Sequence, residues 1–225
     1  SYGSQITIEG DEVQAISLKN QHLTLSPKLS LNVEGNDISV SGSMHIPSAR
    51  FAPKDLSTAK VVSNDEIIVS EKTQRGNTNV FSYTSNLDVS LGDNVTFKIP
   101  GTIGIAIQGK IKGKLTIDDK PGKATLARGE LEIAEGEVIA YKQKFNIEKG
   151  HFIYLGGPID NPTVDITATR KIEEKDIIVG INLRGNYPQL EHVLISEPSM
   201  NESEILAYLF TGRSVDDLDK SQGQS

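Results

Sequence analysis

The chain has 225 residues, of which 36% are hydrophobic and 5% aromatic, and it contains neither Trp nor Cys. This length suits one large all-β domain or two small ones, and the lack of cysteine excludes disulfides, Cys-ligated zinc and a cysteine nucleophile. The formal net charge of -7 argues against nucleic acid as a partner, because that binding needs clustered Lys and Arg to replace counterions.

The first part of the chain alternates apolar and polar residues. Short runs recur up to Val33, and a longer run extends from Ile38 to Ile46. A β-strand turns successive side chains to opposite faces, so this period of two predicts strands with one apolar face. A turn is expected at Glu34–Asp37. Pro47 is expected to end the longer strand, because proline has no N–H to donate to a sheet.

Residues 47–86 are the least regular part of the chain, and Pro, Asp, Asn and Gly punctuate them. This composition predicts a surface loop. Within it we expect a short strand at Ile67–Val69 and a polar loop over Ser70–Asn79.

Regular alternation returns at Ser85. Leu87–Leu91 and Val95–Ile99 each predict a strand, and Gly92–Asn94 predicts the turn between them. A further turn is expected at Glu148–Gly150. The other short runs carry Leu131 and Ile133, Val138 and Ala140, Phe145 and Ile147, Phe152 and Tyr154, Val164 and Ile166, Val179 to Leu183, and Val193 and Ile195.

The longest alternating run extends from Ile103 to Ile117. Gly109 and Gly113 interrupt its apolar face, where a missing side chain lets a strand bend, and they are expected to mark where the sheet curls. The lysines of its polar face could contact lipid headgroups or an acidic partner, but we favour a solvated outer face that discourages edge pairing. The residues expected to face a concave interior are Ile103, Ile105, Ile107, Ile111, Leu115 and Ile117, and those expected to face water are Lys110, Lys112 and Lys114.

One helix is predicted near the C-terminus, over Asn201–Thr211. Asn201 with Glu204 forms a variant of the capping box, and Gly212 suits a C-terminal cap. A helix this short is marginal alone, so its apolar side is expected to dock on the sheet or to plug an open end of it. Residues 214–225 are polar and expected to be disordered. The apolar side of the helix carries Ile205, Leu206, Leu209 and Phe210.

The pattern as a whole predicts an all-β fold of about a dozen amphipathic strands with one short helix. One helix cannot cover that much sheet, so the sheet must cover its own apolar face by closing, stacking or curling. We expect a single curled-sheet domain over residues 1–213, cut from a larger protein. No apolar run approaches the ~20 residues of a membrane helix, and no signal peptide begins the chain, so a targeting signal is expected upstream.

No set of residues predicts a catalytic or metal centre. The Asp pairs at 118–119 and 216–217 lie in turn or tail signals. Glu130, Glu132 and Glu135 could act across strands as general acid and base, but a solvated face is the favoured interpretation. The sequence therefore predicts no enzyme activity and no cofactor. The four histidines, which lack metal-ligand spacing and are assigned to polar faces or loops, are His22, His45, His151 and His192.

Several segments together resemble the C-terminal domain of the TamB family, over most of the chain from about Ile38 to Arg213. The order and spacing of the segments carry the resemblance. Tyr141-Lys142 departs from the Tyr-Gly common in the family, which bears only on a local turn. The segments are Gly42-Ser-Met-His-Ile-Pro47, Gly92-Asp-Asn-Val95, Arg128-Gly-Glu-Leu-Glu-Ile-Ala-Glu-Gly-Glu-Val-Ile-Ala-Tyr141, Phe145-Asn-Ile-Glu-Lys-Gly150, Phe152-Ile-Tyr-Leu-Gly-Gly-Pro-Ile-Asp-Asn-Pro162, Ala168-Thr-Arg170, Gly185-Asn-Tyr-Pro188, Ser196-Glu-Pro198 and Glu204-Ile-Leu-Ala-Tyr-Leu-Phe-Thr-Gly-Arg213.

The resemblance implies a periplasmic protein of a diderm bacterium, anchored in the inner membrane by an N-terminal helix outside this sequence. The family is similar to the AsmA-like, bridge-type lipid transporters, whose fold is a taco-like half-pipe with a hydrophobic interior. It implies phospholipid and a TamA-like barrel-insertion protein as partners in lipid transport and outer-membrane assembly, and no catalytic residues. The residues expected to line the lipid groove are Ile103, Ile105, Ile107, Ile111, Leu115, Ile117, Leu131, Ile133, Phe145, Ile147, Val164 and Ile166.

Three functions compete on this evidence. A lipid conduit needs an apolar face that is continuous across strands, and lipid tails would supply the cover that the chain lacks. An assembly or chaperone module needs an unprotected sheet edge, which would pair with a barrel protein or nascent strands by β-augmentation. A β-solenoid enzyme acting on polysaccharide needs convergent carboxylates, which we do not find. The conduit is the favoured interpretation.

Overall fold

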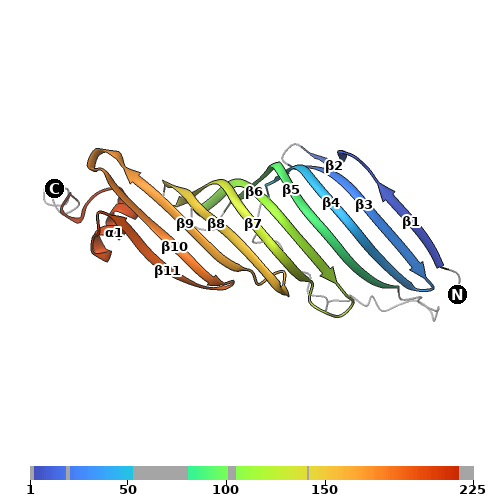
Figure 1. The fold of residues 1–225 in the computed structure, drawn as a ribbon. Coiled ribbons are helices and arrows are strands. Elements are labelled where there is room, and N and C mark those ends of the chain that lie inside the picture. The colour runs from blue at the N-terminus through green and yellow to red at the C-terminus, as the bar shows by residue number, and fades with distance from the viewer. Residues whose placement is uncertain (1–2, 19–20, 53–80, 101–104, 141, 218–225) are drawn as a thin grey trace, which may run out of the picture.

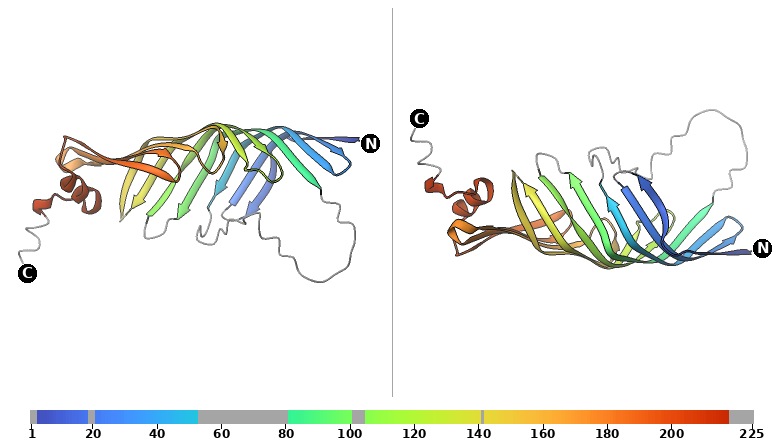
Figure 2. Two further views of the ribbon diagram at one scale, coloured as in Figure 1. Left: turned by 90° about the horizontal axis from the view of Figure 1, so that it is seen from below. Right: turned by 90° about the horizontal axis from the view of Figure 1, so that it is seen from above.

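The computed structural model describes residues 3–18, 21–52, 81–100, 105–140 and 142–217. These residues form one open, curled sheet of 11 strands and one α-helix near the C-terminus. The sheet is a long single layer with β1 near one extreme and α1 at the other (Figure 1), and its strands curl toward the side on which the helix lies (Figure 2). The prediction of an all-β, half-pipe fold with one short helix is confirmed.

The strands are long, and β5 with 19 residues is the longest. A short 3₁₀ turn, η3 (Glu173–Lys175), links β9 to β10, and α1 (Glu202–Thr211) follows the last strand. The strands are β1 (Gly3–Glu9), β2 (Val13–Leu18), β3 (Gln21–Glu34), β4 (Asp37–Phe51), β5 (Ser82–Pro100), β6 (Ile105–Asp119), β7 (Leu126–Ala140), β8 (Gln143–Pro158), β9 (Thr163–Ile172), β10 (Ile177–Asn186) and β11 (Gln189–Glu197).

Strands that follow one another in sequence are neighbours in most of the sheet. The order is β1-β3-β4-β5-β6-β7-β8-β9-β10-β11, and β2 pairs with β3 beside β1. All pairs are antiparallel except β4 with β5, which is parallel. The expected strand at Ile67–Val69 and the expected loop over Ser70–Asn79 fall between these two strands, outside the described residues.

The alternation predicted for β6 is confirmed by its register. Directly opposed residues of an antiparallel pair point to the same face of a sheet. Ile111 lies opposite Ile133, whereas its neighbour Lys112 lies opposite Glu132. We call the face that carries Ile111 and Ile133 the inner face and the opposite one the outer face. The whole strand thus presents aliphatic side chains on one side and lysines on the other.

Two predicted turns are instead irregularities inside continuous strands. Gly92–Asn94 lies within β5, where the register with β6 shifts, and Glu148–Gly150 lies within β8, where the register with β9 shifts. A Cβ on Gly92 would lie 2.8 Å from the Cα of Pro47 on β4, so this glycine lets the neighbouring backbone approach. The turn predictions are wrong because bulges and turns use the same residue types.

The end of the strand predicted at Pro47 is also wrong, since β4 continues to Phe51. The register of β4 with β5 shifts between Ile46 and Ser48, which brackets the proline. A bulge leaves a residue out of the ladder, so the absent N–H of proline costs no sheet hydrogen bond there.

Gly109 and Gly113 both sit where β7 leaves no room for a side chain. A Cβ on Gly113 would lie 2.1 Å from the carbonyl oxygen of Glu130, and one on Gly109 would lie 2.4 Å from that of Glu135. Gly113 also has a φ of 136°, a conformation that favours glycine. The two interruptions of the apolar pattern are therefore required by the close approach of the two strands.

The buried core lies at the C-terminal end of the sheet, beneath α1. The predicted docking of this helix on the sheet is confirmed, because Ile205 and Leu209 are 5% and 8% exposed. Tyr208, at 3%, is a further anchor that the apolar pattern did not include, whereas Phe210 is 46% exposed. The core comprises Phe145, Ala168, Ile172, Val179, Ile205, Tyr208 and Leu209.

Both predicted caps of α1 are present. The side chain of Asn201 accepts a hydrogen bond from the backbone N–H of Glu204 at 2.9 Å, and Gly212 adopts the left-handed conformation with a φ of 74°. After the helix, Asp217 accepts a hydrogen bond from Lys175 at 2.7 Å. Residues 218–225 of the predicted tail lie outside the described part of the chain.

Candidate functional site

The groove residues predicted from the sequence share the inner face wherever the structure describes their side chains. Register places them there, since Phe145 lies opposite Val138 and Ile147 lies opposite Ala168. Ile103 is outside the described residues, and only the backbone of Ile105 is described. The inner-face residues are Ile107, Ile111, Leu115, Ile117, Leu131, Ile133, Phe145, Ile147, Val164 and Ile166.

These residues divide into a buried group and a half-buried group. Ile133, Phe145, Ile147 and Val164 are between 3% and 8% exposed. The other six are half-buried. The curl of the sheet and the helix therefore pack part of the predicted lining, and they leave the rest accessible.

The accessible part continues across the strands on the N-terminal side of β7. Leu31 lies opposite Val40 and Met44 beside Val89, so the aliphatic rows of successive strands meet. In the part of the chain that the structure describes, no second layer covers this stretch, which we call the open inner face (Figure 2). A large uncovered apolar patch marks an interaction site. The half-buried residues of the open inner face include Leu29, Leu31, Val40, Met44, Leu87, Val89, Leu91, Leu115 and Ile117.

The outer face carries a row of cross-strand pairs between basic and acidic side chains. These pairs are exposed, so each contributes about 0–1 kcal/mol. The three glutamates that were considered as a general acid and base therefore each have a partner on this face. Two of these partners are lysines from the polar face of β6 and the third is a histidine, which favours a solvated outer face. The pairs are Lys110–Glu135 at 3.1 Å, Lys112–Glu132 at 3.4 Å, and His151 with Glu130.

Asp165 on β9 joins three partners on the same face, and no pattern in the sequence singled it out. Its carboxylate accepts hydrogen bonds from Lys149 at 2.5 Å and from Asn182 and Arg184 at 3.4 Å each. The hydrogen bond from Lys149 is the main cause that holds the pKa of Asp165 below its usual value. These partners come from β8 and β10, so the strand register was the missing information.

The histidines are not brought together. His22 pairs with Ser48 at 2.8 Å, and His45 pairs with Ser90 at 2.9 Å, both between strands near the N-terminal end of the sheet. His192 lies on β11 at the other end. Over the described ranges, no group of three or more His, Asp or Glu side chains could hold a metal ion.

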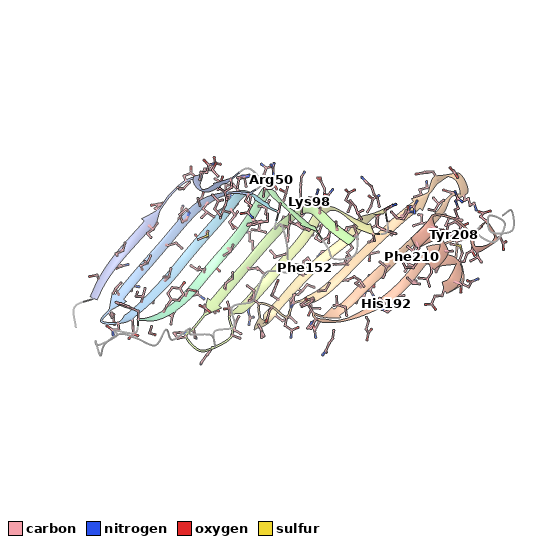
Figure 3. All side chains as sticks on the ribbon, turned by 180° about the vertical axis from the view of Figure 1, so that it is seen from behind. Arg50, Lys98, Phe152, His192, Tyr208 and Phe210 are labelled. Carbon is pink, nitrogen blue, oxygen red and sulfur yellow. The ribbon has the colours of Figure 1, made fainter. Side chains whose placement is uncertain are left out.

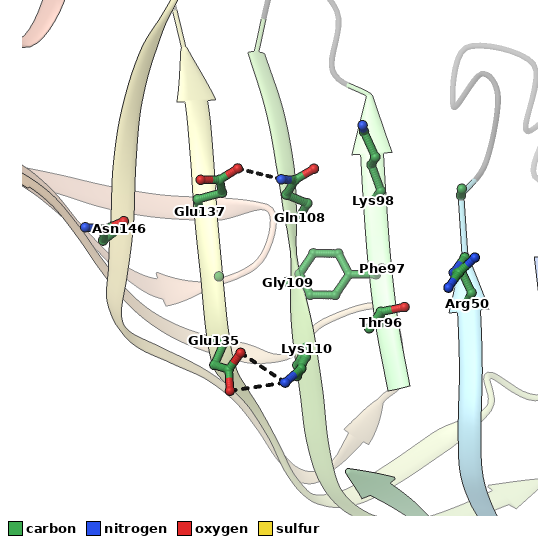
Figure 4. A pocket seen from close by; sticks show the side chains of 12 residues that line it. Arg50, Thr96, Phe97, Lys98, Gln108, Gly109, Lys110, Glu135, Glu137 and Asn146 are labelled. Atoms are coloured by element: carbon green, nitrogen blue, oxygen red, sulfur yellow. Dashed lines mark hydrogen bonds and ion pairs between the residues drawn. The ribbon is translucent and has the colours of Figure 1, made fainter. Parts of the chain in front are cut away.

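A hollow of about 520 Å³ lies on the outer side of β4–β8 (Figure 4). Arg50, Lys98 and Lys110 line it together with Glu135 and Glu137. Charges of both signs surround this hollow, and the Lys110–Glu135 pair closes part of it (Figure 4). It therefore differs in chemistry from the inner face, although Phe97 also lines it.

A second hollow is enclosed between α1 and the inner face, and we call it the α1 cavity. Its volume is about 500 Å³. Three of the predicted groove residues, Ile107, Phe145 and Ile166, help to line it, but the helix roof and the walls from β10 and β11 were not part of that prediction. The complete lining is Ile107, Val138, Ala140, Phe145, Ile166, Ala168, Ile181, Leu183, His192, Leu194, Glu202, Leu206, Leu209 and Phe210.

The two ends of the sheet are edges in the described part of the chain. β1 and β2 pair only with β3, and β11 pairs only with β10. Ile6, Ile8, Val13 and Leu18 on the first two strands are between 43% and 66% exposed. An edge strand offers unpaired backbone N–H and C=O groups to another strand, so the N-terminal edge is a second surface suited to interaction.

Comparison with known proteins agrees with this architecture. A model of the TamB C-terminal domain family matches residues 3–225. The translocation and assembly module subunit TamB of Haemophilus influenzae (strain Rd) is 27% identical over 213 residues, which cover 86% of this chain and 16% of that protein. No helix in the described ranges is long and apolar enough to cross a membrane. With the match extending over nearly the whole curled sheet and its helix, the chain belongs to the TamB C-terminal domain family.

Proposed function

We propose that this domain is a segment of a lipid conduit, in which the open inner face holds the acyl chains of phospholipid. The observation that carries the proposal is the row of half-buried aliphatic side chains that crosses β3–β6 without a described layer over it. In the full-length protein, an inner-membrane anchor would hold the domain in the periplasm and phospholipid would move toward the outer membrane. A TamA-like barrel-insertion protein would be the partner in outer-membrane assembly, and no catalytic step is involved.

The physical basis of the proposal is the transfer of hydrocarbon from water. Each methylene that leaves water gains about 0.8 kcal/mol, and the side chains beneath it are covered at the same time. Apolar contact is non-directional, so an acyl chain can shift from one strand to the next without breaking a specific bond. A surface of this kind suits movement of a chain better than tight retention.

The exposed N-terminal edge favours a second candidate, an assembly or chaperone module. A barrel strand or a nascent strand could add to β1 or β2 by β-augmentation, with backbone hydrogen bonds providing affinity. The exposed Ile6, Ile8 and Val13 would then be covered by the added chain. This candidate uses the edge of the sheet, whereas the conduit uses its inner face, so the two can be tested separately.

The test uses a photo-reactive amino acid, p-benzoylphenylalanine, introduced in cells at adjacent positions of β6. Leu115 lies on the inner face and Lys114 on the outer face, so the two form a matched pair. We expect phospholipid, identified by mass spectrometry, to be attached from position 115 and only weakly from position 114.

Equal attachment of lipid from both positions would reject the conduit. The same amino acid at Ile16 on β2 tests the alternative. A cross-link from position 16 to an outer-membrane barrel protein, without lipid attached at position 115, would favour the assembly module.

A further inference from the structure

The α1 cavity has the size and lining of a site for a hydrocarbon chain. Its volume of about 500 Å³ lies within the roughly 300–1,000 Å³ of small-molecule sites. His192 and Glu202 are the polar members of its lining, and every other lining residue is apolar. An occupant must therefore be apolar over most of its length, because His192 and Glu202 are the lining residues that offer a side-chain hydrogen-bonding partner.

The roof of the cavity is held in place by contacts outside the cavity. Tyr208 is 3% exposed, and its hydroxyl accepts a hydrogen bond from Lys175 at 3.3 Å. Lys175 also donates a hydrogen bond to Asp217 at 2.7 Å. These two bonds join η3 to the helix and to the residues that follow the helix. These anchors fix one side of α1 on the sheet, and Leu206 and Phe210 of the helix line the cavity. Figure 3 shows Tyr208 and Phe210 at the helix end of the sheet.

The polar residues of the lining come from two different elements. His192 is on β11, and Glu202 is in the first turn of α1. Both are exposed residues, so they mark the side on which the cavity opens to water. A carboxylate at this opening disfavours an additional anion, so a zwitterionic or uncharged polar end fits beside it.

We infer that the α1 cavity binds one alkyl chain of a zwitterionic or uncharged amphiphile, with α1 as the roof and the polar end beside His192 and Glu202. This inference rests on the proposed function, because Ile107 and Val138 belong both to the inner face and to the lining of the cavity. A chain on the open inner face can therefore enter without crossing polar surface. The cavity is the position at which a chain becomes enclosed.

The experiment uses the purified chain and phosphatidylcholine vesicles in which one acyl chain of the lipid carries a diazirine at its middle. After irradiation, peptide mass spectrometry maps the modified residues. We expect modified residues both on the open inner face and among the lining of the α1 cavity. Ala140→Phe places a ring in the cavity from its floor and should lower modification of the cavity residues about fivefold, while modification of the open inner face stays unchanged.

Ala106→Phe is the matched control, because Ala106 lies opposite Ile139 on the outer face, and it should leave both signals unchanged. Leu183→Phe narrows the cavity from β10 and replaces Ala140→Phe if circular dichroism shows that variant to be unfolded. Modification of the open inner face with none in the cavity would overturn this inference and leave the proposed function standing, as would cavity modification that neither filling variant lowers. Modification of neither surface would reject both.

Discussion

Replacing Ile111 by arginine puts a charge on the inner face without moving the strand. Ile111 is half-buried and lies opposite Ile133, which is 4% exposed. The next residue, Lys112, points to the outer face and pairs with Glu132 at 3.4 Å. The change Lys112→Glu therefore provides a control that alters charge at the adjacent position on the opposite side of the sheet.

The two changes should cost similar amounts of stability. Full burial of an aliphatic side chain contributes about 1.5–3 kcal/mol, so half-burial of Ile111 contributes about 1 kcal/mol, and the arginine can carry its guanidinium to water along its stem. Lys112→Glu removes an exposed pair worth about 0–1 kcal/mol. Both variants should unfold cooperatively, and the free energy of unfolding should fall by at most about 2 kcal/mol in each.

Their effects on lipid should differ widely. If the guanidinium keeps about two methylenes of an acyl chain off the face, the loss is about 1.6 kcal/mol, which corresponds to more than a tenfold weaker occupancy. The assay is phospholipid attachment from p-benzoylphenylalanine at position 115, normalised to the amount of folded protein. We expect Ile111→Arg to lower attachment about tenfold and Lys112→Glu to leave it within about twofold.

Equal attachment in the two variants, with both folded by urea titration, would refute the reasoning that the inner face carries the chain. Loss of attachment in Lys112→Glu alone would refute it more strongly, because lipid would then be following the outer face.

The other predictions concern the fold that holds this face in place. Asn201→Ala removes the helix cap and should lower the free energy of unfolding by about 1 kcal/mol, measured by thermal melting. Gly113→Ala should lower the free energy of unfolding by about 1–3 kcal/mol because of its backbone conformation alone, and by more because of the clash with β7. The control is Gly157→Ala, where a Cβ meets nothing within 4 Å and the free energy of unfolding should change by no more than about 0.5 kcal/mol. Equal urea midpoints for the two variants would contradict this prediction. The pKa of Asp165 is lowered from its usual 3.8 chiefly by Lys149, so its contribution is present at neutral pH and lost as the pH falls through the lower, folded value. Asp165→Asn should therefore lower stability at pH 7 and reduce its further fall below about pH 3.8, whereas an unchanged acid profile would count against the role of this pair.

The sequence by itself determined the fold class and the two faces of the sheet. The period of two in β6 is a local property, because adjacent side chains of a strand point to opposite sides wherever the strand lies. The caps of α1 were predictable for the same reason, since Asn201 and Gly212 act on backbone groups within one turn of themselves. The placement of Ile111 and Lys112 on opposite faces follows from the chain alone.

Only the tertiary structure decided how the strands meet. The glycine of Gly92–Asn94 serves as well in a turn as in a bulge, and the approach of β4 to β5 selects the bulge. The full burial of Ile133 beside its half-buried partner Ile111 depends on how the sheet curls, and the α1 cavity depends on where the helix docks. These features arise from contacts between residues far apart in the chain. The local alternation of apolar and polar residues does not say which residues of two strands lie opposite each other.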